Sequence, residues 1–571
     1  MGEEGGLAIC DYPLRAVRLN TTAARLLQRC SEQCTCQELA VYLRLPIKRV
    51  QALCEQLRWK GLLEAGPTPP PASWPSITII IPSHNRTGQL QVCLRSLCKL
   101  DYPVHCLEML IVDDASTDET PAMLAQVMQE FEAEGRMIRV VRHTFQQGVA
   151  KSRNTGAEAA RHDLLAYIDS DCVASPDWLA ELVPAFQNEN TAAVGGMIRA
   201  YERKSMLGRY EDIRSSLYMG VRPQLVSIEG PLKYLPTANL LVRREMWQEI
   251  GGFAPLTFGE DVDFCRRLLA TKARIIYLPQ GLVYHDYRTR LWAFLTIRAS
   301  YASAEAALLQ RHPQERRVLI LPPEQATFAG SAVGGLWLTM VGFLGMWRGS
   351  RSATVDWAKT SHIPVPQIPF PYYRRAGLTI VSIVGAMACP RPVSGADTSP
   401  FHRLSSRLWG ENHCRTLPGG QVNPVWGTGI LSRLLGGSCM FLLALILTLL
   451  GTYKRWQKVR KQRVPIRPFT IFRATLRGHL AYTYHLCRHL TRYYTLPLVL
   501  IGLVLPPLLM FVLILIGIVV GVDYVRLGPE MSLGKYALCA MLDDCAYEVG
   551  VVWGCMKHGT WKPLWPIVRK K

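Results

Sequence analysis

The chain has 571 residues and a formal net charge of +21. This length exceeds what a single hydrophobic core usually supports, which excludes one small domain and predicts two or more. The basic excess points to an anionic partner, such as nucleic acid, an anionic membrane or an anionic substrate. The order of elements along the chain must decide among these partners.

Residues 1–66 predict a small α/β unit. A strand-like run over 10–20 precedes three short helices, of which the second begins after Thr35 and the third after Pro46. This order is typical of a winged-helix-like unit. It favours a regulatory or dimerising module and leaves a DNA-binding helix-turn-helix open. The proline-rich stretch 67–75 predicts a stiff linker.

The cysteines give no framework of disulfides or metal ligands. Seventeen are scattered along the chain, and Cys30, Cys34 and Cys36 form the closest group. A structural zinc site would need a further ligand pair at a suitable spacing, and the sequence offers no obvious one. Reduced thiols in a cytosolic domain are therefore predicted. The polar, acidic N-terminus has no signal-peptide pattern.

Residues 76–310 alternate between apolar strand patterns and amphipathic helix patterns. Continuous apolar strands separated by helices predict a mostly parallel sheet that is covered on both faces. The fold class predicted for this part is therefore α/β.

Four short segments carry the chemistry: IPSHNR at 81–86, VDDASTD at 112–118, YIDSD at 167–171 and FGED at 258–261. The first three follow or end an apolar strand. Polar residues at the carboxyl ends of neighbouring parallel strands face one crevice. Such a crevice can hold a divalent metal, a nucleoside diphosphate and a catalytic base.

The metal prediction rests on Asp169 and Asp171, one residue apart after a strand. Hard divalent ions that bridge phosphate oxygens prefer carboxylates, so Mg²⁺ or Mn²⁺ is the expected cofactor. His285 is a candidate to complete the metal site, with a plain structural histidine as the alternative. Taken alone, the Asp-x-Asp pattern is weak, because solvated loops contain it by chance.

Other polar residues of these segments are candidates for contacts with the nucleotide. Asn85 and Arg86 are placed to hold the base and the diphosphate, and Arg153 is placed to contact a phosphate. For Lys151, on the same predicted helix, a phosphate contact and a solvated helix face are equally good interpretations. The predicted nucleotide-sugar-binding residues are Pro82, Asn85, Arg86, Asp113, Asp114, Arg153 and Asp169.

The general base is predicted in the segment FGED. Glu260 and Asp261 follow Gly259 and begin a helix. Acids in a first helical turn are also expected from the helix dipole alone. With the other three segments in order, one of these two carboxylates is the natural base for an acceptor hydroxyl.

The ordered strings IPSHNR, VDDASTD, GVAKSRNTG, AYIDSD, TANLLVRREMWQEIGGF and FGEDVDFCRRL resemble the family-two inverting glycosyltransferases of the GT-A fold. The resemblance covers about residues 76–290. It implies that Asp113, Asp114 and Asp169 contact the nucleotide, that Asp171 binds the metal, and that Asp261 is the base, with Glu260 beside it.

The N-terminal unit resembles the small peptide-recognition domain of pyrroloquinoline-quinone and mycofactocin biosynthesis. Together with a family-two transferase and the C-terminal stretch 543–559, this unit resembles the glycosyltransferases of the mycofactocin system. The resemblance implies transfer of β-1,4-linked glucose from UDP-glucose to a peptide-derived redox cofactor. The stretch 391–432 has no match and is expected to be poorly ordered.

The C-terminal part predicts membrane association through the uncharged, apolar segments 326–347, 434–453 and 493–522. Between Lys454 and Arg492 there are eleven basic residues and no acid. This run is typical of the cytoplasmic side of a bacterial inner membrane, so a lipid bilayer is the expected anionic partner and nucleic acid is not expected. The number of spans stays open, because 376–390 is too short to assign.

Three alternatives remain. One is a processive polysaccharide synthase, which would take an oligosaccharide acceptor; the stretch Arg288–Trp292 lacks the glutamine and the spacing of that class. Another is a non-catalytic, membrane-tethered sensor of nucleotide or peptide, against which the intact acids argue. The last is a DNA-binding regulator built on residues 1–66, which predicts salt-dependent duplex binding.

Overall fold

A computed structural model describes residues 7–11, 14–30, 34–59, 62–63, 73–228, 230–360, 425–462, 464 and 466–569. The chain divides into two compact units, one made of 1–334 and 440–571 and the other of 335–439. The stretch 376–390, which the sequence leaves unassigned, lies outside the described residues, as does most of the stretch 391–432.

The N-terminal unit contains β1 (Leu7–Asp11), β2 (Leu14–Arg18), α1 (Thr21–Arg29), α2 (Cys36–Leu43) and α3 (Ile47–Trp59). The predicted single strand over 10–20 is wrong, because this run forms β2 and the end of β1, which pair antiparallel. Thr35 begins α2 through a capping box in which its hydroxyl accepts from the Glu38 N–H. The three helices share a small apolar core that includes Leu26, Leu39 and Val50.

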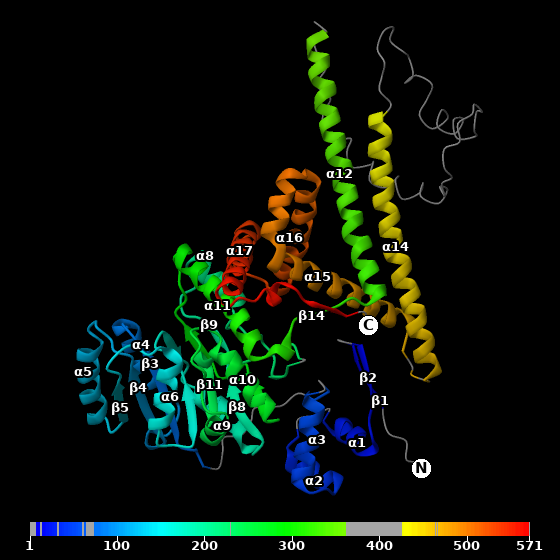
Figure 1. Ribbon diagram of the computed structural model, residues 1–571. Helices are drawn as coiled ribbons and strands as arrows, with labels where there is room; N and C mark the ends of the chain where they lie inside the picture. Colours follow the sequence, from blue (N-terminus) through cyan, green and yellow to red (C-terminus); the bar gives the residue numbers. More distant parts are fainter. Residues whose placement is uncertain are drawn as a thin grey trace. The chain divides into compact units, whose positions relative to one another are not determined.

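The central sheet has eight strands in the order β10-β12-β8-β11-β6-β3-β4-β5. They are β3 (Ile77–Ser83), β4 (Leu107–Asp113), β5 (Met137–Arg142), β6 (Leu164–Tyr167), β8 (Thr191–Gly195), β10 (Gln224–Leu225), β11 (Leu240–Arg243) and β12 (Arg274–Tyr277). The strands β6, β3, β4 and β5 run parallel, whereas β11 lies antiparallel to both of its neighbours. The predicted mostly parallel α/β sheet is confirmed (Figure 1).

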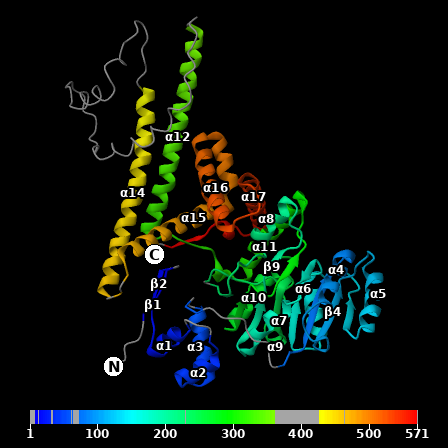
Figure 2. The ribbon, with the colours of Figure 1, turned by 180° about the vertical axis from the view of Figure 1, so that it is seen from behind.

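Both faces of the sheet are covered by helices, which explains why β3 and β4 are buried along their whole length. The helices are α4 (Thr87–Leu97), α5 (Thr120–Ala133), α6 (Val149–Ala159), α7 (Trp178–Leu182), α9 (Arg244–Glu249) and α10 (Glu260–Ala270). Ile79 packs in one core with residues of α4, α5 and α7. Ile80 packs in a second core with residues of α6, α9 and α10. Figure 2 shows these helices from behind.

A smaller sheet lies beside the main one, in the order β7-β13-β9. It consists of β7 (Cys172–Ala174), β9 (Ile198–Ala200) and β13 (Val283–His285). The apolar run 192–200 forms two strands, β8 and β9, that belong to different sheets. After β9 comes α8 (Met206–Arg214), and after β13 comes α11 (Leu291–Arg311).

The C-terminal part is mainly helical, with α12 (Pro323–Thr360), α14 (Val425–Lys461), α15 (Pro468–Val504), α16 (Pro506–Leu527) and α17 (Leu533–Lys557). The expectation of poor order up to residue 432 is wrong for 425–432, which begin α14. The predicted apolar segment 493–522 is divided between α15 and α16 at Leu505, because prolines begin the second helix. The strands β14 (Val318–Ile320) and β15 (Ile567–Arg569) pair in parallel, which joins the segment after α17 to the segment before α12.

Within the described residues, two helices are long and apolar enough to cross a membrane: Ser432–Lys461 and Pro506–Leu527. The predicted segment 326–347 lies in α12 and is not among them. The length and composition of these two helices support membrane association.

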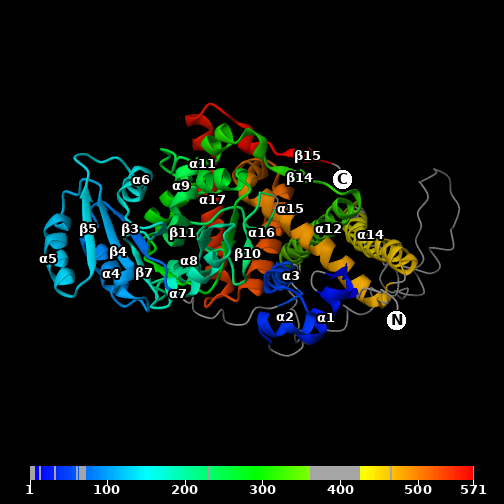
Figure 3. The ribbon, with the colours of Figure 1, turned by 90° about the horizontal axis from the view of Figure 1, so that it is seen from below.

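Helix α17 packs closely against α11 (Figure 3). A Cβ atom built on Gly550 would lie 2.1 Å from the carbonyl oxygen of Ala299, and one on Gly554 would lie 2.3 Å from that of Ser303. Only glycine allows the two backbones to come so near. The C-terminal helix is therefore packed directly on the helix that follows β13.

Candidate active site

The polar segments of the sequence meet at the carboxyl edge of β6, β3 and β4, which are neighbours in the sheet. Asn85 and Arg86 follow β3, Asp113 ends β4, and Asp169 follows β6. The parallel register pairs Ser83 with Asp113 and so brings the ends of β3 and β4 level. The predicted convergence of these segments at one edge is what the strand order produces.

Arg153 of α6 joins two of the predicted acids. Its Nη2 donates to Oδ1 of Asp169 at 2.7 Å, and its Nη1 donates to Oε1 of Glu260 at 2.6 Å. The side chain is only 3% exposed. This guanidinium therefore ties the β6 loop to the start of α10 and balances two carboxylates.

Asp171 faces a histidine on one side and an arginine on the other. Its Oδ1 lies 3.5 Å from Nε2 of His285, and its Oδ2 accepts from Nη1 of Arg86 at 2.5 Å. Burial opposes ionisation of this carboxyl, but His285 and Arg86 together hold its pKa below the usual value. Asp171 is thus a carboxylate with two cationic or polarisable neighbours.

Asp171, Cys172 and His285 offer ligand atoms that lie within 4.8 Å of one another. Burial raises the pKa of Cys172 well above its usual value, and sulfur is not a ligand that hard divalent ions prefer. The carboxylate and the imidazole remain as donors, and this oxygen and nitrogen pair fits Mg²⁺ or Mn²⁺. Asp169, predicted as a further ligand, is not in this group and turns Oδ1 toward Arg153.

The two acids after β4 are bonded to nearby loops. Asp114 Oδ1 accepts from the Gln147 N–H at 2.8 Å and faces His143 Nδ1 at 2.7 Å, while Oδ2 accepts from the Gly148 N–H at 2.8 Å. Burial opposes ionisation, but these donors lower the pKa of Asp114. Asp114 therefore holds the N-terminus of α6 in this structure, and its predicted contact with a nucleotide remains a prediction.

Asp113 holds the β4 loop. Its Oδ1 accepts from the Ser116 N–H at 3.0 Å, and its Oδ2 lies 3.0 Å from Nη1 of Arg142. Asn85 adopts a positive φ of 53°, which asparagine tolerates better than most residues. Its Oδ1 accepts from the Thr117 N–H at 2.8 Å, which joins the β3 and β4 loops. Pro82 is buried inside β3.

Asp261 lies in the first turn of α10. Gly259 begins this helix with φ 80°, and a Cβ there would meet Leu308 at 3.0 Å, so the glycine of FGED is required by both backbone and packing. Burial, followed by the neighbouring Glu260 carboxylate, raises the pKa of Asp261 to about 8. A carboxyl with this pKa can accept a proton near neutral pH.

Sequence reasoning missed two tyrosines beside these acids. Burial and then the charge of Asp261 raise the pKa of Tyr234. Tyr301 of α11 lies near Asp169 and Asp171, and burial is the main cause that raises its pKa. No spacing or motif marks these tyrosines, because Tyr301 reaches the site only through the packing of α11.

The sequence is similar to those of known glycosyltransferases. Residues 78–251 match the family described as Glycosyl transferase family 2. The chain is 32% identical over 258 residues to a "Pre-mycofactocin glycosyltransferase" of Mycobacterium tuberculosis, covering 44% of this chain and 52% of that protein. It is 28% identical over 201 residues to a "Beta-monoglucosyldiacylglycerol synthase" of Nostoc sp., covering 34% and 42% of the two chains.

Among solved structures, a mannosyltransferase of Pyrobaculum calidifontis in complex with GDP-Man and Mn²⁺ aligns with 22% identity and a TM-score of 0.36, over 45% of this chain and 70% of that one. The chain spans about half the length of the mycobacterial relative. Asp261 and His285 lie beyond the family match, whereas the acids after β4 and β6 lie inside it. Residues 78–251 are a glycosyl transferase family 2 domain.

Proposed function

We propose that this protein is a metal-dependent inverting glycosyltransferase that moves a sugar from a UDP-sugar to a hydroxyl acceptor. The observation that carries the proposal is the cluster at one sheet edge, where Asp171 faces His285 while Arg153 joins Asp169 to Glu260. This arrangement offers a site for a hard cation beside a general base. Transfer of a sugar from a nucleoside-diphosphate sugar needs both.

Asp171 and His285 are the residues that would hold the metal, with Asp169 as a further candidate. A divalent ion bound there neutralises charge on a departing diphosphate. Arg86 already lies against Asp171 and would add a second positive charge near the phosphates. Asn85, Asp113 and Asp114 shape the loops on which the nucleotide would rest.

Asp261 is the proposed general base. It takes the proton of the acceptor hydroxyl as that oxygen forms a bond to the anomeric carbon of the donor. The bond from the anomeric carbon to the diphosphate oxygen breaks at the opposite face, so UDP leaves and the configuration inverts. Glu260, paired with Arg153, keeps this turn of α10 in place.

The acceptor we propose is a peptide-derived redox cofactor of the mycofactocin type, and the donor is UDP-glucose with β-1,4 linkage of the sugars. The similarity to the mycobacterial relative supports the type of acceptor. The donor and the linkage are what the family resemblance of the sequence implies. The proposed organisation is a peptide-recognising unit at 1–66, a linker at 67–75, a transferase domain at 76–310 and a membrane-associated region at 311–571.

We further propose that the protein resides in the inner membrane with its catalytic domain facing the cytoplasm. The two apolar helices support membrane association. The run of eleven basic residues between Lys454 and Arg492 supports the orientation, because such runs favour the cytoplasmic face.

The test is release of UDP by the full chain in detergent, from a panel of UDP-sugars, with and without a peptide-derived acceptor. We expect acceptor-dependent release from UDP-glucose, lost in EDTA and restored by Mn²⁺. Long polymer formed from UDP-sugar alone would instead support a processive synthase. Unchanged donor consumption in EDTA would refute the metal site, and absence of turnover with every donor would favour a non-catalytic sensor.

A further inference from the structure

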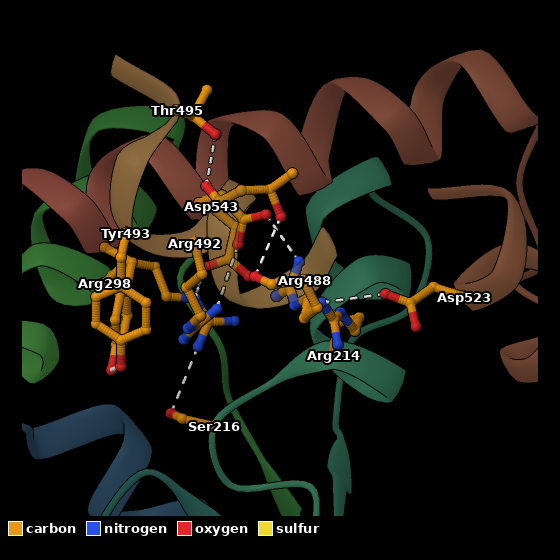
Figure 4. A network of polar contacts seen from close by, with 12 residues as sticks. Arg214, Ser216, Arg298, Arg488, Arg492, Tyr493, Thr495, Asp523 and Asp543 are labelled. Atoms are coloured by element: carbon orange, nitrogen blue, oxygen red, sulfur yellow. Dashed lines mark hydrogen bonds and ion pairs between the residues drawn. The ribbon is translucent and has the colours of Figure 1, made fainter. Parts of the chain in front are cut away.

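The C-terminal helices meet the catalytic domain through a buried network of charged side chains (Figure 4). Its members come from α8, α11, α15, α16 and α17, and all are buried or half-buried. The positively charged side chains are Arg214, Arg298, Arg488 and Arg492. The negatively charged ones are Glu211, Asp523, Asp543 and Asp544. The formal charges balance, as a buried set of this kind requires.

Arg298 of α11 stands at the centre of this network. Its Nη2 donates to Oε2 of Glu211 on α8 at 2.6 Å. Its Nε lies 3.3 Å from Oδ1 of Asp543 on α17, and the hydroxyl of Tyr210 donates to Oδ2 of the same aspartate at 2.9 Å. Asp543 is only 3% exposed, so these contacts replace its water.

Asp543 is an anion in this setting. Burial opposes its ionisation, but Arg298 and Arg492 hold its pKa below the ordinary value. Removing its charge would leave four buried guanidinium groups with only three carboxylates, and removing one partner from a buried charged network destabilises it strongly.

An apolar cluster lies beside the charges. It contains Leu207 and Tyr210 of α8, Phe294 of α11, Val520 of α16, and Tyr536 of α17. Arg214 at the end of α8 also lies 3.3 Å from Asp523 of α16. Helix α8 is therefore fixed to the C-terminal helices along its length.

Asp212, which follows Glu211 on α8, connects this network to the proposed metal site. Asp212 Oδ1 accepts from the Ala200 N–H of β9 at 2.8 Å and from Nε of Arg199 at 2.8 Å. In the parallel pair of β9 and β13, Ala200 lies opposite His285. Glu211 and Asp212 thus join the C-terminal helices on one side to the strand of His285 on the other.

Tyr287 provides a second connection between α8 and His285. The ring of Tyr287 lies 4.5 Å from that of His285, and Tyr287 is close enough to Glu211 and Ser215 for both to affect its ionisation. The histidine is therefore supported by β9 and by an aromatic ring, and each of these supports touches α8 or the segment that follows it.

We infer that Asp543 and Arg298 are positioning residues of the catalytic site: they hold α8, and through α8 they hold the strand that sets His285 beside Asp171. The C-terminal helices are then a working part of the transferase rather than only an anchor. This inference rests on the proposed function, because it assigns His285 to the metal.

The experiment compares Asp543→Asn with Glu548→Gln in the full chain in detergent. Glu548 lies on the same helix, is equally buried, and accepts from the Leu496 N–H at 3.0 Å, which a glutamine oxygen also does. Binding of Mn²⁺ in the presence of UDP is followed by the EPR signal of the free ion. We expect about tenfold weaker binding for Asp543→Asn, typical of a lost supporting contact, and wild-type binding for Glu548→Gln.

Amide hydrogen exchange of residues 283–290 without metal gives a second readout. We expect faster exchange there in Asp543→Asn and no change in Glu548→Gln. If Asp543→Asn does not fold, Tyr210→Phe takes its place, since it removes one hydrogen bond to Asp543 with little loss of volume; about threefold weaker binding is then expected.

The outcomes test the proposed metal site and the coupling of Asp543 to His285 separately. A wild-type chain that binds no Mn²⁺ would overturn the proposed metal site, and exchange at 283–290 would still decide the coupling. A wild-type chain that binds Mn²⁺, together with folded variants that bind it equally well and exchange normally, would overturn the coupling and leave the proposed function standing.

Discussion

Arg86 donates to Asp171 at 2.5 Å, so a cation from the β3 loop already occupies one oxygen of the predicted metal ligand. A divalent ion at Asp171 would have to compete with this guanidinium. Once displaced, the guanidinium would be free to contact a diphosphate, which it binds well because of its forked geometry. Arg86 should therefore oppose metal binding and favour donor binding.

The variant Arg86→Gln tests this opposition. We expect Mn²⁺ to bind about threefold more tightly without nucleotide, and the KM for the UDP-sugar to rise about tenfold, because a charge-assisted hydrogen bond is lost. Calorimetric titration of Mn²⁺ and initial rates of UDP release measure the two effects. Arg95→Gln, at an exposed position of the helix α4 that follows Arg86, is the control and should change neither. Weaker Mn²⁺ binding in Arg86→Gln would contradict the proposed competition.

Asp261→Asn should raise the stability of the fold and lower the activity. The folded-state pKa of Asp261 is raised from 3.8 to about 8, so between these values the folded chain keeps a proton that the unfolded chain has lost. Stability due to this group therefore falls as pH rises through that window. Asparagine removes the effect, and we expect the free energy of unfolding at pH 8 to increase by up to about 5 kcal/mol, since each pKa unit corresponds to about 1.4 kcal/mol.

The same variant should lose at least about 100-fold in rate, as expected for removal of a general base. In the wild-type chain, kcat/KM should rise with pH up to about 8, because only the ionised carboxyl accepts a proton. Chemical unfolding and pH–rate profiles measure these effects. A stabilised Asp261→Asn that still turns over donor at the wild-type rate would show that the base lies elsewhere.

Arg153→Met should destabilise the fold, because it leaves Asp169 and Glu260 without their shared buried cation. We expect a loss of about 3 kcal/mol, typical of breaking a buried ion pair. Arg153→Lys keeps the charge but cannot reach both acids with a planar fork, so an intermediate loss is expected. Lys151→Gln is the control, since this half-exposed side chain makes only a long surface contact with Glu158. Equal unfolding midpoints for all three variants would refute the bridging role.

Much of the sheet edge could be predicted from the sequence. The order of strand patterns placed Asp113, Asp169 and Arg86 at the ends of neighbouring strands, because parallel strands end on the same side. Local spacing also identified Gly259 as the start of a helix and Thr35 as a cap. These features depend on short stretches of chain, where the periodicity of apolar residues is informative.

Contacts between distant segments could not be predicted in this way. The bonds of Asp114 to the Gln147 and Gly148 N–H groups depend on where α6 begins in space. The pairing of Arg298 with Asp543 joins residues 245 positions apart, and no local pattern marks either one. The limits of the helices that contain the apolar stretches also depend on such contacts, because the run 493–522 belongs partly to α15 and partly to α16.

The contact of α17 with α11 gives a prediction that is independent of catalysis. In Gly550→Ala, the added methyl group would lie 2.1 Å from the backbone oxygen of Ala299, which cannot move aside as a flexible side chain could. We expect a loss of about 2 kcal/mol in unfolding free energy, as for overpacking of a core. Thermal unfolding of the full chain in detergent measures it.

Gly534→Ala, on the same helix, is the matched control, because a Cβ there meets no atom within 4 Å. It should leave the unfolding midpoint unchanged or raise it slightly, since alanine favours the helix over glycine. A further variant, Gly554→Ala, faces Ser303 across the same contact and should behave like Gly550→Ala. If both contact variants unfold at the same temperature as Gly534→Ala, α17 does not pack on α11 in solution, and the route from Asp543 to the catalytic domain is lost with it.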